Sequence, residues 1–245
     1  MDWDTFEAAL LDLDGVITPT AEVHMRAWAH LFTDVFAQRG LAPYREQDYF
    51  DYLDGKPRYE GVASILASRG IELPWGDPSD SPETETVCGL GNRKDGVFNE
   101  TLTSEGIQGY AGSLRLLDFL DGRGIGKAIV SSSKNARAVL AAAGILDRFP
   151  VIVDGLVAAE QGIAGKPAPD MFAYAADQLG VPHNKAFVVE DALSGVRAGA
   201  AGDFGVVVGV DRGTGADRLR EAGAAIIVHE LDELIPADHR PEETR

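Results

Sequence analysis

Two aspartates, Asp12 and Asp14, follow an apolar run in the segment AALLDLDG (8–15). Because residues two apart on a β-strand point to the same face, we expect both carboxylates to project together where a buried strand ends. One such aspartate can attack a phosphorus atom and carry the phosphoryl group, while the other exchanges a proton with the attacking or leaving oxygen. The spacing therefore indicates phosphoryl-transfer chemistry; the alternative is a turn followed by a surface charge.

Other polar side chains stand where further buried strands are expected to end. One apolar run finishes in the serines 131–133, another finishes in Glu190 and Asp191, and Lys166 lies in the loop GKPAPD just before a helix. In open parallel sheets, ligands bind beyond the carboxyl ends of the strands. We therefore expect these groups to converge on one crevice. Each also has a plainer interpretation, as a serine cap, a solvated lysine or an acidic pair at a helix N-terminus.

The expected crevice is chemically coherent. Asp12, Glu190 and Asp191 offer hard carboxylate oxygens, to which Asp14 adds a backbone carbonyl, and such a ligand set suits Mg²⁺. Lys166 and a serine hydroxyl would hold a phosphate. The whole chain carries a net charge of −17, so a bound phosphate needs local positive charge of this kind.

The composition narrows the class of protein. Apolar residues make up 45% of the 245 residues, enough for a sizeable core. The negative charge disfavours a nucleic-acid partner, no apolar run approaches the roughly 20 residues that span a bilayer, and the N-terminus lacks the pattern of a signal peptide. The single cysteine, Cys88, rules out an internal disulfide framework. We expect a cytoplasmic protein with no membrane or nucleic-acid partner, and a monomer, with higher oligomers left open.

The elements that would position these groups form an alternating pattern. Short, continuous apolar runs predict six parallel strands covered on both faces, at residues 8–14, 126–133, 149–155, 185–191, 204–210 and 224–230. Segments whose sequences are typical of helices lie between these strands, at 113–124, 135–144, 168–180 and 192–202. Strand and helix alternate from about residue 108 onward, which predicts a doubly wound α/β fold. The glycine-rich segment 209–217 is expected to be a loop, and the polar segment 236–245 to fray.

Residues 21 to 104 differ from the rest of the chain because they contain no convincing strand. Apolar residues follow a helical stripe in 21–40, and 58–70 and 92–106 also have helical patterns. We therefore expect an all-helical unit at 21–104, inserted after the first strand. Residues 1–20 and 105–245 would form the α/β core.

Four motifs, DLDGVIT, SSSKN, GKPAPD and VVEDALSG, occur in the order of the four motifs of the haloacid dehalogenase-like superfamily. The chain most resembles the β-phosphoglucomutase branch of that superfamily, and the resemblance covers nearly its whole length. It implies a Rossmann-like core with an inserted helical cap that opens and closes, a Mg²⁺ cofactor and a small phosphorylated sugar as substrate.

The resemblance also assigns roles to single residues. Asp12 matches the nucleophile and Asp14 the general acid and base, and the Mg²⁺ ligands match Asp12, the Asp14 carbonyl, Glu190 and Asp191. Ser131 and Lys166 match residues that bind the transferring phosphate, and Thr20 and His24 match residues at the hinge. In the cap, the matches are Gly55, Arg58 and Lys94. Ser133, Lys134 and Asn135 match residues that hold a distal phosphate together with Arg58. The cap residues and His24 also have plain interpretations, as surface or packed side chains.

Two positions depart from the family pattern. Asp54 stands where the substrate loop usually has lysine, and Pro19 replaces an aspartate common in the hinge. The resemblance implies a phosphomutase that makes glucose 6-phosphate from β-glucose 1-phosphate through the 1,6-bisphosphate. The alternatives are a phosphatase of small sugar phosphates, which Asp54 favours somewhat, and a non-catalytic phosphosugar-binding module.

Overall fold

Six parallel strands form one sheet in the order β3-β2-β1-β4-β5-β6, as a computed structural model of the protein describes for residues 1–239. The strands are β1 (Ala8–Leu11), β2 (Gly126–Val130), β3 (Val151–Val153), β4 (Ala186–Glu190), β5 (Val206–Val210) and β6 (Ile226–Val228). The first strand lies at the centre, where Leu11 pairs with Ile129 of β2 and Val189 of β4. The strand order reverses beside β1, so its carboxyl end is the point where a ligand crevice is expected.

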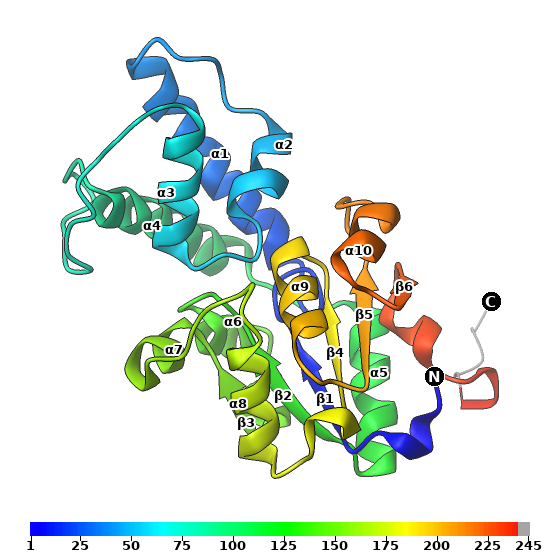
Figure 1. Ribbon diagram of the computed structural model, residues 1–245. Helices are drawn as coiled ribbons and strands as arrows, with labels where there is room; N and C mark the ends of the chain where they lie inside the picture. The colour runs from blue at the N-terminus through cyan, green and yellow to red at the C-terminus, as the bar shows by residue number, and fades with distance from the viewer. Residues whose placement is uncertain (240–245) are drawn as a thin grey trace, which may run out of the picture.

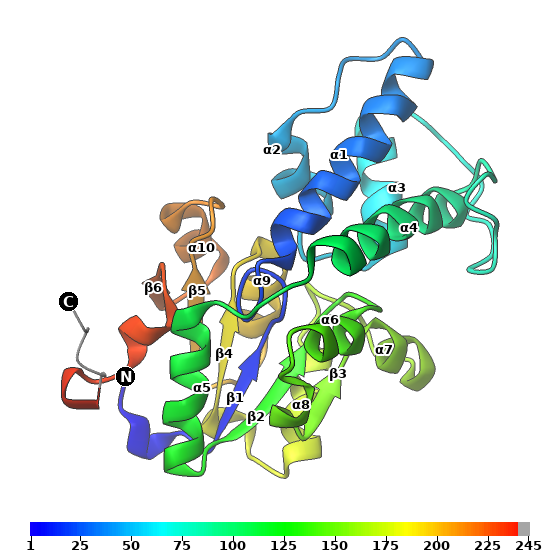
Figure 2. The same cartoon turned by 180° about the vertical axis from the view of Figure 1, so that it is seen from behind.

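Helices cover both faces of this sheet (Figures 1 and 2). Ala9 and Leu11 of β1 belong to an apolar core shared with α5 (Ala111–Arg123) and α6 (Ala136–Ala142). Ala8 and Leu10 belong to a second core. That second core includes residues of α8 (Asp170–Leu179), α9 (Leu193–Ala201) and α10 (Ala216–Ala222). A strand that buries both faces reads as a continuous apolar run, which explains the sequence pattern and confirms the predicted doubly wound α/β fold.

A separate group of helices stands beyond the carboxyl ends of the strands, toward which the strand arrows point (Figure 1). It comprises α1 (Thr20–Gln38), the short α2 (Glu46–Asp48), a π-helical turn (Tyr49–Leu53), α3 (Arg58–Ser68) and α4 (Val87–Glu105). All of these except α2 share a third apolar core, to which α1 contributes Trp28, Phe32 and Phe36. We call this group the cap; the division of the chain at 21 and 104 stays a prediction, since α1 begins at Thr20 and α4 ends at Glu105.

Three local expectations differ from the structure. The α4 helix begins at Val87 rather than near residue 92, because the Thr86 hydroxyl accepts a hydrogen bond from the Gly89 amide at 2.9 Å and caps it. The short helix α7 (Gly155–Gln161) is not foreseen in the sequence; Asp154 caps it. The end of the expected loop 209–217 belongs to α10, which begins at Ala216.

The structure describes only part of the C-terminal segment. Within the polar segment 236–245, Ala237–His239 form a 3-10 turn, and residues 240–245 lie outside the described part of the chain. Across residues 1–239, none of the helices combines the length and the apolar character that a bilayer-spanning segment needs.

Candidate active site

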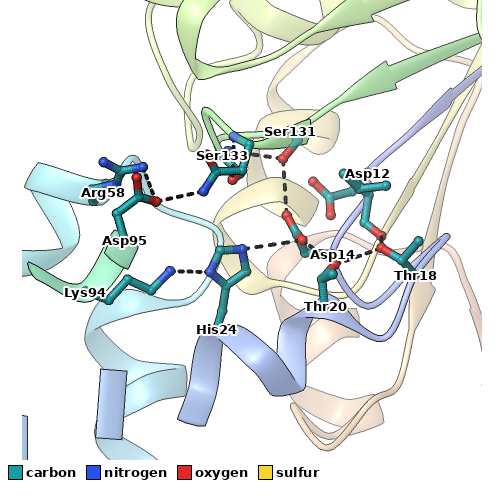
Figure 3. A network of polar contacts seen from close by, with 12 residues as sticks. Asp12, Asp14, Thr18, Thr20, His24, Arg58, Lys94, Asp95, Ser131 and Ser133 are labelled. Carbon is teal, nitrogen blue, oxygen red and sulfur yellow. Dashed lines mark hydrogen bonds and ion pairs between the residues drawn. The ribbon is translucent and has the colours of Figure 1, made fainter. Parts of the chain in front are cut away.

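A pocket lies between the sheet and the cap, at the carboxyl ends of β1, β2 and β4 (Figure 3). Its cavity volume is about 70 Å³, and twelve of the predicted site residues line it: Asp12, Asp14, His24, Gly55, Arg58, Lys94, Ser131, Ser133, Lys134, Asn135, Glu190 and Asp191. The other two, Thr20 and Lys166, do not line the cavity but hydrogen-bond to residues that do. The structure thus brings all the predicted residues together.

Lys166 fixes one end of the pocket. Its ammonium lies 2.6 Å from Asp12 Oδ1 and 2.6 Å from Glu190 Oε1, and donates a third hydrogen bond to the Val130 carbonyl at 2.8 Å. The lysine is 1% exposed. Burial alone would lower its pKa, but the charges of Asp12 and Glu190 raise the pKa above the usual lysine range. The ammonium therefore stays charged and holds the Asp12 carboxylate in place.

The same end is short of positive charge. Burial raises the pKa of Asp12 well above its usual value, with further increases from Glu190 and Asp14 that Lys166 offsets only in part. Burial likewise raises the pKa of Asp191, next to Asp54 and Glu190. Several carboxylates thus share one ammonium. Among residues 1–239, no three acidic, imidazole or thiol groups converge closely enough to enclose a metal ion as the side chains lie.

Asp14 has a different environment from Asp12. It accepts hydrogen bonds from the Thr20 hydroxyl and, at 3.2 Å, from the Ser131 hydroxyl, and its Oδ1 lies 3.5 Å from His24 Nε2 (Figure 3). Burial raises the pKa of this carboxyl, but His24, Thr20 and Lys94 outweigh it and lower the pKa to about 2. Asp14 is therefore ionised at neutral pH and able to accept a proton.

A buried lysine of α4 continues this chain of contacts. The Lys94 ammonium contacts His24 Nδ1 and lies 4.9 Å from the centre of the Trp28 ring and 4.8 Å from that of Phe98. Burial, followed by the charge of Arg58, lowers the Lys94 pKa from 10.5 to about 7. The His24 ring stacks on Phe98 at 4.1 Å, and its pKa is lowered by burial and by Lys94. A neutral His24 ring with its proton on Nε2 can donate to Asp14 and, at Nδ1, accept from the Lys94 ammonium.

The far end of the pocket carries a second group of phosphate-binding types. Arg58 from the cap lies opposite Asn135, which follows β2, and Ser133 and Lys134 line the same cavity. The Ser133 amide donates to the Ser131 hydroxyl at 3.1 Å, and the Asn135 amide donates to the Ser133 hydroxyl at 3.1 Å, so the loop after β2 is held in one arrangement. An acidic side chain, Asp95, also reaches this end, where it accepts hydrogen bonds from Arg58 and Asn135; none of the four sequence motifs contains it.

The cap meets the core through the backbone of residues 54 and 55. Ser194 donates to the Asp54 carbonyl at 3.1 Å, and Ser132 donates to the Gly55 carbonyl at 2.9 Å. A Cβ on Gly55 would lie 2.2 Å from Ser194 Oγ, and its φ of +66° favours glycine. The Asp54 side chain hydrogen-bonds Tyr49, and burial followed by Glu190 raises its pKa to about 7. The sequence assigned neither serine a role at the cap, although Ser132 lies inside the motif SSSKN and Ser194 inside VVEDALSG.

Pro19 has a local explanation in the structure. It is the residue immediately before α1, with a φ of −75°, and Thr20, the first helical residue, hydrogen-bonds Asp14. The proline ring fixes φ near this value, and the backbone donor that proline lacks is one that a helix start leaves unpaired. Pro19 thus suits the entry into α1.

Comparisons with known proteins agree with this geometry. A sequence model of haloacid dehalogenase-like hydrolases matches residues 6–203. The chain is 49% identical to the beta-phosphoglucomutase of Mycobacterium bovis over 240 residues, covering 93% of this chain and 91% of the relative. The crystal structure of a β-phosphoglucomutase from Clostridium difficile is similar, with a TM-score of 0.73 and 27% identity over 94% of this chain and 93% of that one. CbbY from Rhodobacter sphaeroides, in complex with xylulose 1,5-bisphosphate, has a TM-score of 0.72 and 25% identity over 96% and 98% of the two chains.

Proposed function

The chain belongs to the haloacid dehalogenase-like hydrolase family, and from that membership and its site we propose that it is a phosphomutase that converts β-glucose 1-phosphate to glucose 6-phosphate. The reaction would run through β-glucose 1,6-bisphosphate, with Asp12 carrying the phosphoryl group between the two half-reactions. The name and the 49% identity of the Mycobacterium bovis relative support this substrate.

The observation that carries the proposal is the two-ended pocket. Asp12 and Asp14 lie at one end, and Arg58, Lys134 and Asn135 line the other. A phosphatase of monophosphates needs only the first end, whereas a mutase must hold one phosphate while the other reacts and then exchange them. The bisphosphate in the complex of CbbY is a ligand of the same kind, which supports a two-ended site.

Asp14 would manage the proton in both half-reactions. When the sugar C6 hydroxyl attacks the phosphoryl group on Asp12, the ionised Asp14 accepts the hydroxyl proton, and the bond from phosphorus to the Asp12 oxygen breaks. After the bisphosphate turns around, Asp12 attacks the other phosphorus, and Asp14 returns the proton to the departing C1 oxygen. The low pKa of about 2 keeps Asp14 ionised before the first transfer and makes its protonated form a ready proton donor in the second.

The donor set at the Asp12 end fits Mg²⁺, the cofactor usual for this family. The carboxylates of Asp12, Glu190 and Asp191 and the Asp14 carbonyl are hard oxygen ligands. Burial, followed by repulsion from neighbouring carboxylates, raises the pKa of Asp12 and of Asp191, and a divalent cation would relieve that repulsion. When bound, the metal would neutralise charge on the transferring phosphoryl group. Lys166 would hold the Asp12 carboxylate and share that role.

The cap would shield the phosphoryl group on Asp12 from water. Ser132 and Ser194 hold the cap backbone at residues 54 and 55 against the core, directly over the pocket. A phosphorylated aspartate is consumed by water unless the site excludes it, so closure would favour transfer to a sugar over hydrolysis. We expect the cap to open for exchange of sugar phosphates about Thr20 and the segment 104–110.

One assay separates the proposed mutase from a phosphatase. Purified protein is incubated with Mg²⁺ and β-glucose 1-phosphate, with and without the 1,6-bisphosphate, and both glucose 6-phosphate and free phosphate are measured. We expect glucose 6-phosphate without matching free phosphate, and loss of that activity in Asp12→Asn. Free phosphate released in amounts equal to the substrate consumed would show a phosphatase instead.

A further inference from the structure

The carboxylate of Asp95 lies between Arg58 and Asn135, two residues that line the far end of the pocket (Figure 3). Its Oδ1 accepts a hydrogen bond from Arg58 Nη2 at 2.6 Å and another from Asn135 Nδ2 at 2.7 Å. Arg58 begins α3 and Asp95 lies on α4, both in the cap, whereas Asn135 precedes α6 in the core. One oxygen atom of the cap thus joins a cap cation to a core amide.

This position is built for an anion. A guanidinium and a side-chain amide donate toward one point, and Ser133 and Lys134 line the same cavity. The side chains of Arg58 and Asp95 are 13% and 23% exposed, so their ion pair is partly shielded from water and from salt. A carboxylate at that point satisfies the donors as a phosphate oxygen would.

We propose that Asp95 is an internal stand-in for the distal phosphate, which occupies this subsite while the enzyme is empty and must leave it when a sugar phosphate binds. The inference rests on the proposed function for the identity of the ligand, a phosphorylated sugar. Asp95 then has two effects. It competes with the phosphate, and it joins the cap to the core before substrate arrives.

The competition lowers the apparent affinity for phosphate. A ligand binds only the fraction of molecules whose subsite is free, so the apparent dissociation constant rises as that fraction falls. Asp95 also repels an incoming phosphate by its charge if it stays nearby. Both effects act in the same direction, and both disappear when the side chain loses its charge.

The experiment compares Asp95→Asn with Asp51→Asn by calorimetric titration. Asp51 is a matched control, because it also belongs to the cap and pairs with a core arginine, Arg218, at 3.0 Å, but its partners Gln47 and Arg218 do not line the pocket. The probes are glucose 6-phosphate and inorganic phosphate. We expect Asp95→Asn to bind both roughly three- to tenfold more tightly than wild type, the range for the net contribution of one hydrogen bond. Asp51→Asn is expected to match wild type.

A second variant ties the gain in affinity to this subsite. In the double variant Arg58→Ala/Asp95→Asn, the gain in phosphate affinity over wild type is expected to vanish, because the guanidinium that the phosphate would contact is gone. Unchanged or weaker binding by Asp95→Asn would overturn the proposal and mean that Asp95 orients Arg58 for the phosphate. An equal gain in Asp51→Asn would also overturn it, since any lost cap charge would then suffice.

The second proposed effect, that Asp95 joins the cap to the core, is tested by a separate measurement. Small-angle scattering of the ligand-free proteins should give a larger radius of gyration for Asp95→Asn than for wild type, with saturating glucose 6-phosphate removing the difference. An identical radius without ligand would refute this part of the proposal. Neither phosphate affinity nor scattering depends on turnover, so these results stand apart from the mutase assay. If the mutase assay showed a phosphatase instead, the proposal that Asp95 occupies this subsite would still be decided by these two measurements.

Discussion

Replacing Lys94 with methionine should make the folded protein more stable at neutral pH. The lysine is 2% exposed, and no carboxylate lies within ion-pairing distance of its ammonium in the described part of the chain. Burial lowers its pKa from 10.5 to about 7. Below pH 10.5 the unfolded chain takes up a proton on Lys94, but the folded protein does so only below about pH 7. The cost of burial therefore grows as the pH falls between these values and is constant below them.

The magnitude follows from the two pKa values. Since one pKa unit corresponds to about 1.4 kcal/mol, the cost is about 4 kcal/mol at pH 7 and about 1 kcal/mol at pH 9.5. The attraction between the ammonium and the rings of Trp28 and Phe98 offsets part of it, by about 1 to 2 kcal/mol. Methionine retains the apolar stem and the ring contacts, so we expect Lys94→Met to be about 2 to 3 kcal/mol more stable than wild type at pH 7.

Urea unfolding followed by circular dichroism at pH 7 and pH 9.5 tests this, with Lys185→Met as the control. Lys185 lies in the turn that precedes β4, at the end of the sheet away from the pocket, and its replacement should not stabilise the folded protein. In the proposed mutase, kcat/KM of Lys94→Met should fall, because His24 and the substrate lose a contact. If the variant is no more stable than wild type at pH 7, or gains equally at both pH values, burial of Lys94 is not costly and the reasoning fails.

Three further predictions concern the core and the contact between cap and core. Gly55→Ala should lose most activity, because its Cβ would meet Ser194 Oγ at 2.2 Å, whereas Gly70→Ala, with the same left-handed φ and no atom within 4 Å, should keep it; equal activities would contradict a role for this contact. Lys166→Met should lower the free energy of unfolding by about 3 to 5 kcal/mol at pH 7.5. The loss should be smaller at pH 5, where the abandoned Asp12 carboxylate takes up a proton, and a loss independent of pH would argue against that cause. Removal of divalent cations with a chelator should lower Tm and abolish turnover, and Mg²⁺ should restore both; an unchanged Tm would count against a metal at Asp12.

The sequence predicts the core site well because the fold brings strand ends together by rule. Asp12 lies directly after β1, and its amide continues the strand pairing by donating to the Val189 carbonyl at 3.0 Å. Asp14 lies in the turn beyond, which the sequence assigned to the strand. Both still line the pocket. A parallel sheet fixes where its carboxyl ends lie, and residues placed there need no further information about packing.

The cap contributions are less predictable, since they depend on how separate helices pack. Asp95 reaches Arg58 and Asn135, which are 37 and 40 residues away in the chain. Its neighbour Lys94 has a low pKa because tertiary packing buries it, beside the rings of Trp28 and Phe98, and because Arg58 lies nearby. The sequence names Lys94 by resemblance to a family, but it gives no sign of the lysine's energetic cost. Burial and partner geometry arise from tertiary packing, which a motif does not encode.

Adjacent residues of α4 therefore serve the two ends of the pocket. Asp95 reaches the distal phosphate subsite, and Lys94 contacts His24, which lies beside Asp14. The groups that lower the Asp14 pKa to about 2 include His24 and Lys94, and both belong to cap helices. When the cap moves away, Asp14 loses these groups and its pKa must rise toward the value set by burial and water. Closure of the cap over a sugar phosphate would thus displace Asp95 and bring His24 and Lys94 back beside Asp14 in one movement, so that phosphate binding at one end is coupled to the surroundings of the proton-transfer group at the other.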